Sequence, residues 1–199
     1  MILTRDTSNR MVQDPRKWIR SRLATLELRK FTAGYSREAA ILMPIFERDG
    51  EHYFLLTRRT EEVETHKGQI SFPGGRCRKD ESFENAALRE TREEVGILEQ
   101  EIEILGRLHD YLSSTGYRVV PFAGYLDHTF SAVPEAREVA EILLIPFHVF
   151  LDPGRLRVEQ MVRQGRTVDV YFYSYGNHEI WGLTARIIKE FLAAIRGPV

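Results

Sequence analysis

The stretch Gly75–Ile97, GRCRKDESFENAALRETREEVGI, decides how this chain folds and what it can bind. Near its end, Glu90, Glu93 and Glu94 follow one another closely. On a helix of about 100° per residue, Glu94 lies about 40° to one side of Glu90, and Glu93 lies about 60° to the other. Carboxylates on neighbouring turns repel one another by roughly 0.2–0.5 kcal/mol per pair. A bound cation would convert this repulsion into attraction.

Oxygen donors suit a hard divalent ion, so these glutamates favour Mg²⁺ or Mn²⁺ over zinc. The competing interpretation is a solvated acidic face beside Arg89 and Arg92, which is usual for an isolated glutamate-rich helix. We expect the helix to begin at the N-cap residue Ser82 and to end at Gly96, which suits the left-handed C′ position. Its buried stripe is expected on the far side, formed by Leu88, Val95 and the flanking Thr91.

The remaining sequence predicts strands on both sides of this helix. Asp49-Gly50 is a two-residue hairpin signal between two apolar runs. A helix is expected from Pro15 through about Lys30, and a closing helix over residues 182–195. The expected strands cover residues 39–46, 52–57, 69–73, 102–109, 117–126, 141–145, 155–162 and 168–175. This order predicts an α/β (α+β) fold whose mixed sheet is covered by helices on both faces.

The length of 199 residues suits one domain with an extension, and we expect an N-terminal helical extension over 1–35 before a domain over 36–199. The net charge of −1 gives no general attraction for nucleic acid or a membrane surface. No segment has the apolar length of a secretory signal or a membrane span, and Cys77 as the single cysteine excludes an internal disulfide. A cytoplasmic protein without a nucleic-acid or membrane partner is the expectation.

The spacing of residues within Gly75–Ile97 resembles that of a known family. Gly75 is followed after five residues by Glu81, after seven more by Arg89-Glu90, after two more by Glu93-Glu94, and after one more by Gly96-Ile97. This resembles the Nudix hydrolase signature G-x5-E-x7-R-E-U-x-E-E-x-G-U, where U is a bulky aliphatic residue and Thr91 is the one departure. The resemblance implies a Nudix-type α/β/α sandwich with a mixed central sheet over residues 36–199, and a metal-dependent pyrophosphohydrolase.

The resemblance assigns roles to residues of the signature. Glu90 and Glu94, one helical turn apart, are the expected primary metal ligands. Glu93 is expected either as a further ligand or as the catalytic base, and the Gly74 carbonyl as an added ligand. Arg89 is expected to pair with a neighbouring carboxylate and hold the helix while the ligands stay correctly aimed.

Three further residues are expected to complete the centre. Gly75, together with Gly74, lets the backbone turn tightly because glycine tolerates positive φ. The resemblance implies that Glu81 supports the loop or a second ion. Nudix enzymes often take the general base from a distant loop, and Glu138 is the candidate here, ahead of Glu93. A solvated loop carboxylate is the non-functional interpretation of Glu138.

The residues before the signature bear on the substrate. Residues 55–60, LLTRRT, and 66–75, HKGQISFPGG, resemble the pattern LLTxR[SA]-x3-R-x3-G-x3-FPGG of Nudix coenzyme A pyrophosphatases. This implies cleavage of CoA or CoA derivatives to phosphopantetheine species and adenosine 3′,5′-bisphosphate. Thr60 stands where Ser or Ala is usual, and Glu64 stands where the pattern has Arg. The expected phosphate contacts are Arg58, Arg59, His66 and Lys67.

Two other functions stay open on the sequence alone. The same chemistry could act on another nucleotide, such as ADP-ribose, a dinucleotide or a nucleoside triphosphate, because Glu64 would repel a phosphate that an arginine would bind. A non-catalytic, nucleotide-sensing Nudix domain is the alternative from a different class, although Glu90, Glu93 and Glu94 are all present. The Trp18 side of the first helix is expected either to pack on the domain or to form a homodimer contact.

Overall fold

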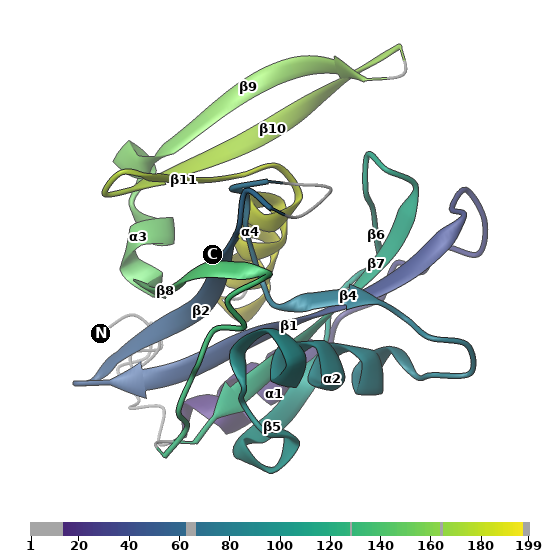
Figure 1. Ribbon diagram of the computed structural model, residues 1–199. Coiled ribbons are helices and arrows are strands. Elements are labelled where there is room, and N and C mark those ends of the chain that lie inside the picture. Colours follow the sequence, from purple (N-terminus) through teal and green to yellow (C-terminus); the bar gives the residue numbers. More distant parts are fainter. Residues whose placement is uncertain (1–13, 63–66, 128, 164, 197–199) are drawn as a thin grey trace.

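The computed structural model describes residues 14–62, 67–127, 129–163 and 165–196, arranged as Figure 1 shows. Its main sheet comprises, within these ranges, the eight strands β1 (Arg37–Arg48), β2 (Glu51–Arg59), β3 (Ile70–Ser71), β4 (Gly74–Arg76), β5 (Ile102–Arg107), β6 (Tyr111–Leu112), β7 (Tyr117–Leu126) and β8 (Val139–Pro146). The central order is β3-β2-β1-β7-β5, and β4, β6 and β8 pair with β1, β7 and β2. β1 and β7 are parallel and the other pairs are antiparallel, which confirms the predicted mixed sheet.

Helices cover both faces of this sheet (Figure 1). They are α1 (Pro15–Ala24), α2 (Phe83–Val95), α3 (Phe147–Leu151) and α4 (Gly182–Arg196), with 3-10 turns at Glu99–Glu101 and Pro153–Arg155. Ala86 of α2 packs with Leu42 of β1 on one face. On the other face, Ile19 of α1 and Phe191 of α4 join Met43 of β1 in the largest core cluster. This arrangement confirms the predicted α/β/α layers.

Turns and helix caps form where the sequence predicts them. Asp49 and Gly50 join β1 to β2 with φ values of 54° and 75°. The Ser82 side chain accepts a hydrogen bond from the Asn85 N–H at 3.1 Å and caps α2, and Gly96 ends the helix in the left-handed conformation with φ 73°. The local chemistry of these residues is therefore sufficient to set both ends of α2.

The buried stripe of α2 differs from the predicted one. Thr91 and Val95 are fully buried as expected, but Leu88 is only half-buried. Ala86 and Ala87 face the sheet in its place, because their small side chains allow helix and strands to approach closely. The Thr91 hydroxyl donates to the Ala87 carbonyl at 2.7 Å, so the residue that departs from the signature is buried with its polar group satisfied.

The first helix is shorter than predicted. It ends at Ala24, because the chain beyond it pairs with the segment before β6, where the Phe31 N–H donates to Asp110 Oδ2 at 2.9 Å. Trp18 Nε1 donates to the Ile195 carbonyl of α4 at 3.0 Å. The Trp18 side of α1 therefore packs on the domain, which is the first of the two expected alternatives. The boundary at residue 35 stays a prediction.

A second sheet has the order β11-β10-β9, with β9 (Leu156–Arg163), β10 (Arg166–Tyr175) and β11 (His178–Trp181). The predicted pairing of the strands at 155–162 and 168–175 is confirmed. The strands β4, β6 and β11 were not predicted as separate strands. In Figure 1 this sheet projects past the main sheet, above β4 and the β6–β7 hairpin. None of the described helices is both long enough and apolar enough to cross a membrane.

Candidate active site

Arg89 lies at the centre of the signature residues. Its Nε donates to Glu81 Oε1 at 2.7 Å, and its Nη2 donates to Glu81 Oε2 at 2.9 Å. Its Nη1 donates to Glu90 Oε1 at 2.6 Å and to Glu93 Oε2 at 2.9 Å, and Nη2 also reaches the Arg76 carbonyl at 3.1 Å. The guanidinium lowers the pKa of Glu81 to about 2. Arg89 was expected to pair with one neighbouring carboxylate, and it pairs with three, those of Glu81, Glu90 and Glu93.

Glu94 faces Arg59 of β2 and is withdrawn from solvent. Its side chain is 7% exposed, and its Oε2 has no hydrogen-bond partner within the described part of the chain. Arg59 Nη1 lies 3.7 Å from Glu94 Oε1, and Arg59 Nε is likewise buried without a described partner. Burial raises the pKa of Glu94 to about 8; Arg59 opposes this rise and the Glu90 carboxylate adds to it. A solvated acidic face is therefore the wrong interpretation for this residue.

Glycines bring β4 against α2. A Cβ on Gly75 would lie 2.6 Å from the Glu90 carboxylate, and one on Gly74 would lie 2.4 Å from the Ala40 carbonyl. Gly74 also has φ 153°, which other residues rarely adopt. The two glycines belong to a short strand paired with β1 instead of the predicted tight turn, but the close approach that required glycine is present. Gly74 as a metal ligand stays a prediction.

Glu93 is held near the surface. Its side chain is 42% exposed, and it accepts from Arg78 Nη2 at 3.1 Å as well as from Arg89. In the described ranges, no group of three or more His, Cys, Asp and Glu side chains gathers to hold an ion. Arg89 Nη1 joins Glu93 to Glu90, while Arg78 binds the other oxygen of Glu93, and Glu93 as a metal ligand stays a prediction.

The loop before β8 carries Glu138 to the same region. The Glu135 N–H donates to the Glu94 carbonyl at 2.8 Å, which ties the loop to the end of α2. Thr60 Oγ1 donates to the Arg137 carbonyl at 2.8 Å, and the Thr60 N–H donates to the Glu138 carbonyl at 3.0 Å. The exposed Glu138 lies close enough for its charge to raise the pKa of Glu94. Sequence reasoning treated Thr60 only as a departure from a pattern and missed this docking role.

Arg58 and Arg59 are neighbours in the sequence but take different partners. Arg59 faces Glu94, whereas Arg58 Nε donates to Glu141 Oε2 at 3.0 Å. Lys67 is exposed in the turn before β3. Two residues named from the sequence lie outside the described residues, namely Glu64 and His66.

The carboxylates that α2 presents fit a divalent cation. The Glu94 oxygen that has no partner among the described residues needs a donor or a positive charge, and Glu90 beside it is only 18% exposed. Burial raises the pKa of both groups, and a cation would keep both ionised. An all-oxygen donor set suits a hard ion. The fit rests on Glu90 and Glu94, because both are largely withdrawn from solvent, whereas Glu93 is more exposed and is bound by Arg78 as well as by Arg89.

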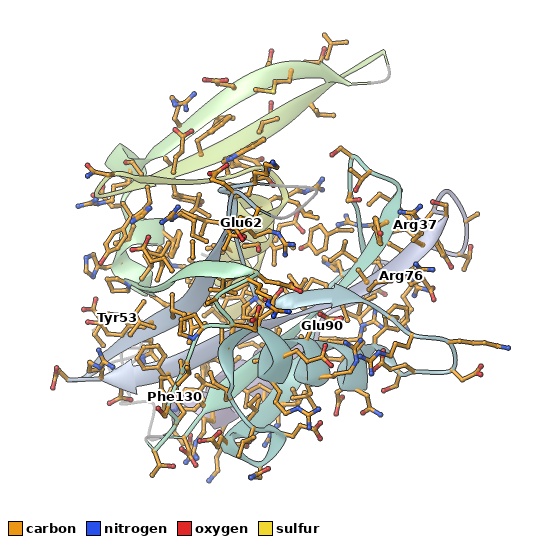
Figure 2. The ribbon with its side chains drawn as sticks, in the orientation of Figure 1. Arg37, Tyr53, Glu62, Arg76, Glu90 and Phe130 are labelled. Carbon is orange, nitrogen blue, oxygen red and sulfur yellow. The ribbon has the colours of Figure 1, made fainter. Side chains whose placement is uncertain are left out.

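Figure 2 shows Glu90 on α2, below β4. The family model of the NUDIX domain matches residues 36–165, which is most of the chain. Together with the α/β/α fold and the glutamate helix, this match shows that the chain belongs to the Nudix family. It is a Nudix hydrolase, an enzyme of the pyrophosphohydrolase class. Nudix hydrolases generally use divalent metal ions.

Two relatives with 40% sequence identity cover most of this chain. The "Uncharacterized Nudix hydrolase NudL" of Photorhabdus laumondii is 40% identical over 162 residues, which cover 81% of this chain and 86% of that protein. The protein of the same description from Yersinia pestis (strain Pestoides F) is 40% identical over 156 residues, 78% of each chain. The solved Nudix hydrolase RenU from M. Smegmatis has a TM-score of 0.50, 20% identity and coverage of 59% and 78%. This last likeness supports the fold alone.

Proposed function

We propose that this Nudix hydrolase cleaves the diphosphate linkage of CoA or CoA derivatives, giving phosphopantetheine species and adenosine 3′,5′-bisphosphate. The observation that carries the hydrolytic site is Glu94, a buried carboxylate beside Glu90 with one oxygen that no described residue binds. The pattern over residues 55–75 supports CoA as the substrate. The proposed cofactor is Mg²⁺ or Mn²⁺.

Glu90 and Glu94 would hold the ion, with the Gly74 carbonyl as a further ligand from β4. When bound, the ion neutralises phosphate oxygens and lowers the pKa of a water, so that hydrolysis runs at neutral pH. Arg89 keeps Glu90 in position, because the two hydrogen bonds from Arg89 to Glu81 fix its own orientation. The protein thus supplies a rigid carboxylate pair on one side of the diphosphate.

Glu138 is the proposed general base, ahead of Glu93. The Glu138 carboxylate is exposed and takes part in no ion pair among the described residues, and it lies close enough to Glu90 and Glu94 for its charge to raise the pKa of both. It can therefore accept a proton from the attacking water and pass it to solvent. Glu93 is engaged by Arg78 and Arg89, which leaves its carboxylate less free to move toward an attacking water.

Arg59 is the best placed of the proposed phosphate contacts. Its side chain is 25% exposed, and its Nε has no partner in the described structure. A guanidinium in this state can bind a phosphate oxygen while it stays beside Glu94. Lys67 and His66 are proposed as further contacts, and Arg58 would first have to leave Glu141.

The test is a comparison of substrates with the purified chain. CoA, ADP-ribose and ATP are incubated with Mg²⁺ or Mn²⁺, and products are identified by mass spectrometry. We expect CoA to give the highest kcat/KM, with adenosine 3′,5′-bisphosphate as a product. Background turnover of CoA beside rapid cleavage of another compound would overturn the CoA assignment. No turnover of any diphosphate would contradict the proposed reaction.

A further inference from the structure

Two arginines that pair with no acidic residue in the described structure lie next to each other beside the site. We propose that Arg76 and Arg37 form an anion subsite, which binds a phosphate monoester on the nucleoside part of the diphosphate substrate. This inference rests on the proposed function and deepens it, because it assigns residues to a second anionic group of the same substrate.

The strand register places both side chains on one face of the main sheet. Arg76 of β4 is directly opposite Ala39 of β1, and directly opposed residues share a face. Arg37 precedes Ala39 by two positions in the same strand, so it points the same way. Diagonal neighbours of this kind lie about 7–8 Å apart, which allows one phosphate to contact both guanidinium groups.

This face is the one opposite α2. Gly75 is paired with Ala40, and a Cβ on Gly75 would meet the Glu90 carboxylate, so both residues face α2. Ala40 indeed packs with Ala86 of α2. Arg76, the next residue along β4, must then point to the other side. Figure 2 agrees, since Arg37 and Arg76 lie above β4 and Glu90 lies below it.

The positive charge of this pair is not compensated. Neither guanidinium takes part in an ion pair with a described residue, and Arg37 Nη1 donates only to the Tyr117 hydroxyl at 3.2 Å. Arg78, by contrast, is paired with Glu93. A bound phosphate would offer both guanidinium groups charge-assisted hydrogen bonds that no described carboxylate gives them.

The position of Arg76 suits a substrate that spans β4. Arg89 Nη2 binds the Arg76 carbonyl at 3.1 Å, so the subsite is fixed relative to Glu90. Within the described structure β4 pairs with β1 alone, which leaves its other edge unpaired. A substrate whose diphosphate lies at Glu90 can cross this edge and place a further phosphate beside Arg76. In CoA that group is the 3′-phosphate, one ribose away from the diphosphate.

Kinetics with two matched substrates test the subsite. CoA and dephospho-CoA differ only in the 3′-phosphate, so the ratio of their kcat/KM values reports on that group. We expect Arg76→Gln and Arg37→Gln each to lower this ratio about tenfold, mainly through KM for CoA. Arg92→Gln is the matched control, because Arg92 is an exposed arginine of α2 with no ion pair to a described residue. A ratio within twofold of wild type in both variants would overturn the inference.

Direct binding separates this inference from the proposed function. Calorimetric titration compares adenosine 3′,5′-bisphosphate with AMP on the wild-type chain and on Arg76→Gln. We expect the wild type to bind the bisphosphate about tenfold more tightly, and the variant to lose that preference. Equal affinities in the wild type would overturn the subsite even if CoA is cleaved. If the wild type prefers the bisphosphate and Arg76→Gln loses this preference, but CoA is not cleaved, the subsite is supported and the proposed substrate is overturned.

Discussion

Arg89 binds Glu81 through two hydrogen bonds of 2.7 and 2.9 Å, which join the loop after β4 to helix α2. The fork of a guanidinium matches a carboxylate in a way that an ammonium group does not. The same side chain reaches Glu90 and Glu93, so the loop contact and the position of the proposed metal ligand depend on one residue.

Arg89→Lys should therefore weaken both the fold and the activity. We expect the free energy of unfolding to fall by about 1–3 kcal/mol and kcat to fall at least about tenfold, because Glu81 and Glu93 lose buried partners. Urea unfolding and steady-state kinetics measure the two effects. Arg92→Lys on the exposed side of the same helix should change stability by less than about 0.5 kcal/mol. Equal behaviour of the two variants would contradict the central role of Arg89.

Glu94→Gln separates metal binding from folding. Because the pKa of Glu94 is raised from 4.5 to about 8 in the metal-free fold, the folded state holds the proton more tightly than the unfolded state. The wild type with EDTA should therefore lose stability as pH rises from about 4.5 to about 8. The variant should not lose stability over this pH range. Mn²⁺ at pH 8 should not raise its melting temperature, and it should show almost no turnover. A Mn²⁺ shift equal to that of wild type would exclude Glu94 as a ligand.

Glu138→Gln tests the general base. Since Glu138 is exposed, the variant should keep its melting temperature within about 1 °C of wild type, while kcat should fall about 10²–10⁴-fold. Glu93→Gln should cause a smaller loss of kcat, because hydrogen bonds from Arg78 and Arg89 already hold the Glu93 carboxylate. Glu84→Gln serves as the control, because Glu84 is an exposed residue in the first turn of α2. A larger loss for Glu93→Gln than for Glu138→Gln would reverse the assignment.

Thr60 should act through the position of the Glu138 loop. Thr60→Val removes the hydroxyl that donates to the Arg137 carbonyl at 2.8 Å, and we expect kcat to fall several-fold with KM little changed. Stability should fall by about 0.5–1.5 kcal/mol. Thr60→Ser keeps the hydroxyl and should restore both values. If Thr60→Ser behaves like Thr60→Val, the hydrogen bond is not the cause.

Cys77 should be a slow thiol. Burial, together with the nearby carboxylates of Glu38 and Glu81, raises its pKa to about 11, so little thiolate exists at pH 8. Its rate of reaction with iodoacetamide should keep rising up to at least pH 10. In urea the rate should instead be half-maximal near pH 9.0, the ordinary pKa of a cysteine, and should level off by about pH 10. A plateau below pH 9.5 in the folded protein would contradict the raised pKa.

Much of the fold was predictable because its signals are local. The Asp49-Gly50 turn, the Ser82 cap and the Gly96 stop depend on the conformations that these residue types prefer. The errors arose where distant residues decide the outcome. The end of α1 depends on Asp110, far along the chain. The buried side of α2 contains Ala86 and Ala87 instead of Leu88, because the small alanines allow the helix to approach the sheet.

For the candidate site, the sequence identified the chemical groups but not their partners. The spacing Glu90–Glu94 places two carboxylates one turn apart in any α-helix, so this pair follows from sequence alone. No spacing rule indicates that Arg59 faces Glu94 while Arg58 turns to Glu141, since Glu94 lies on α2 and Glu141 lies opposite Arg58 in the pairing of β2 with β8. Likewise, the bond from Thr60 to Arg137 joins residues 77 positions apart.

The Nudix family, the glutamate helix and its two ends follow from the sequence, because they depend on residue types at fixed short spacings. Which glutamate is buried, which is paired with arginine and which loop carboxylate lies near them follow from the packing of distant segments. Burial and pairing are set by strands and loops that are distant in sequence, and these change the pKa and freedom of each carboxylate. The same packing brought Arg37 beside Arg76, two residues that no sequence motif connects.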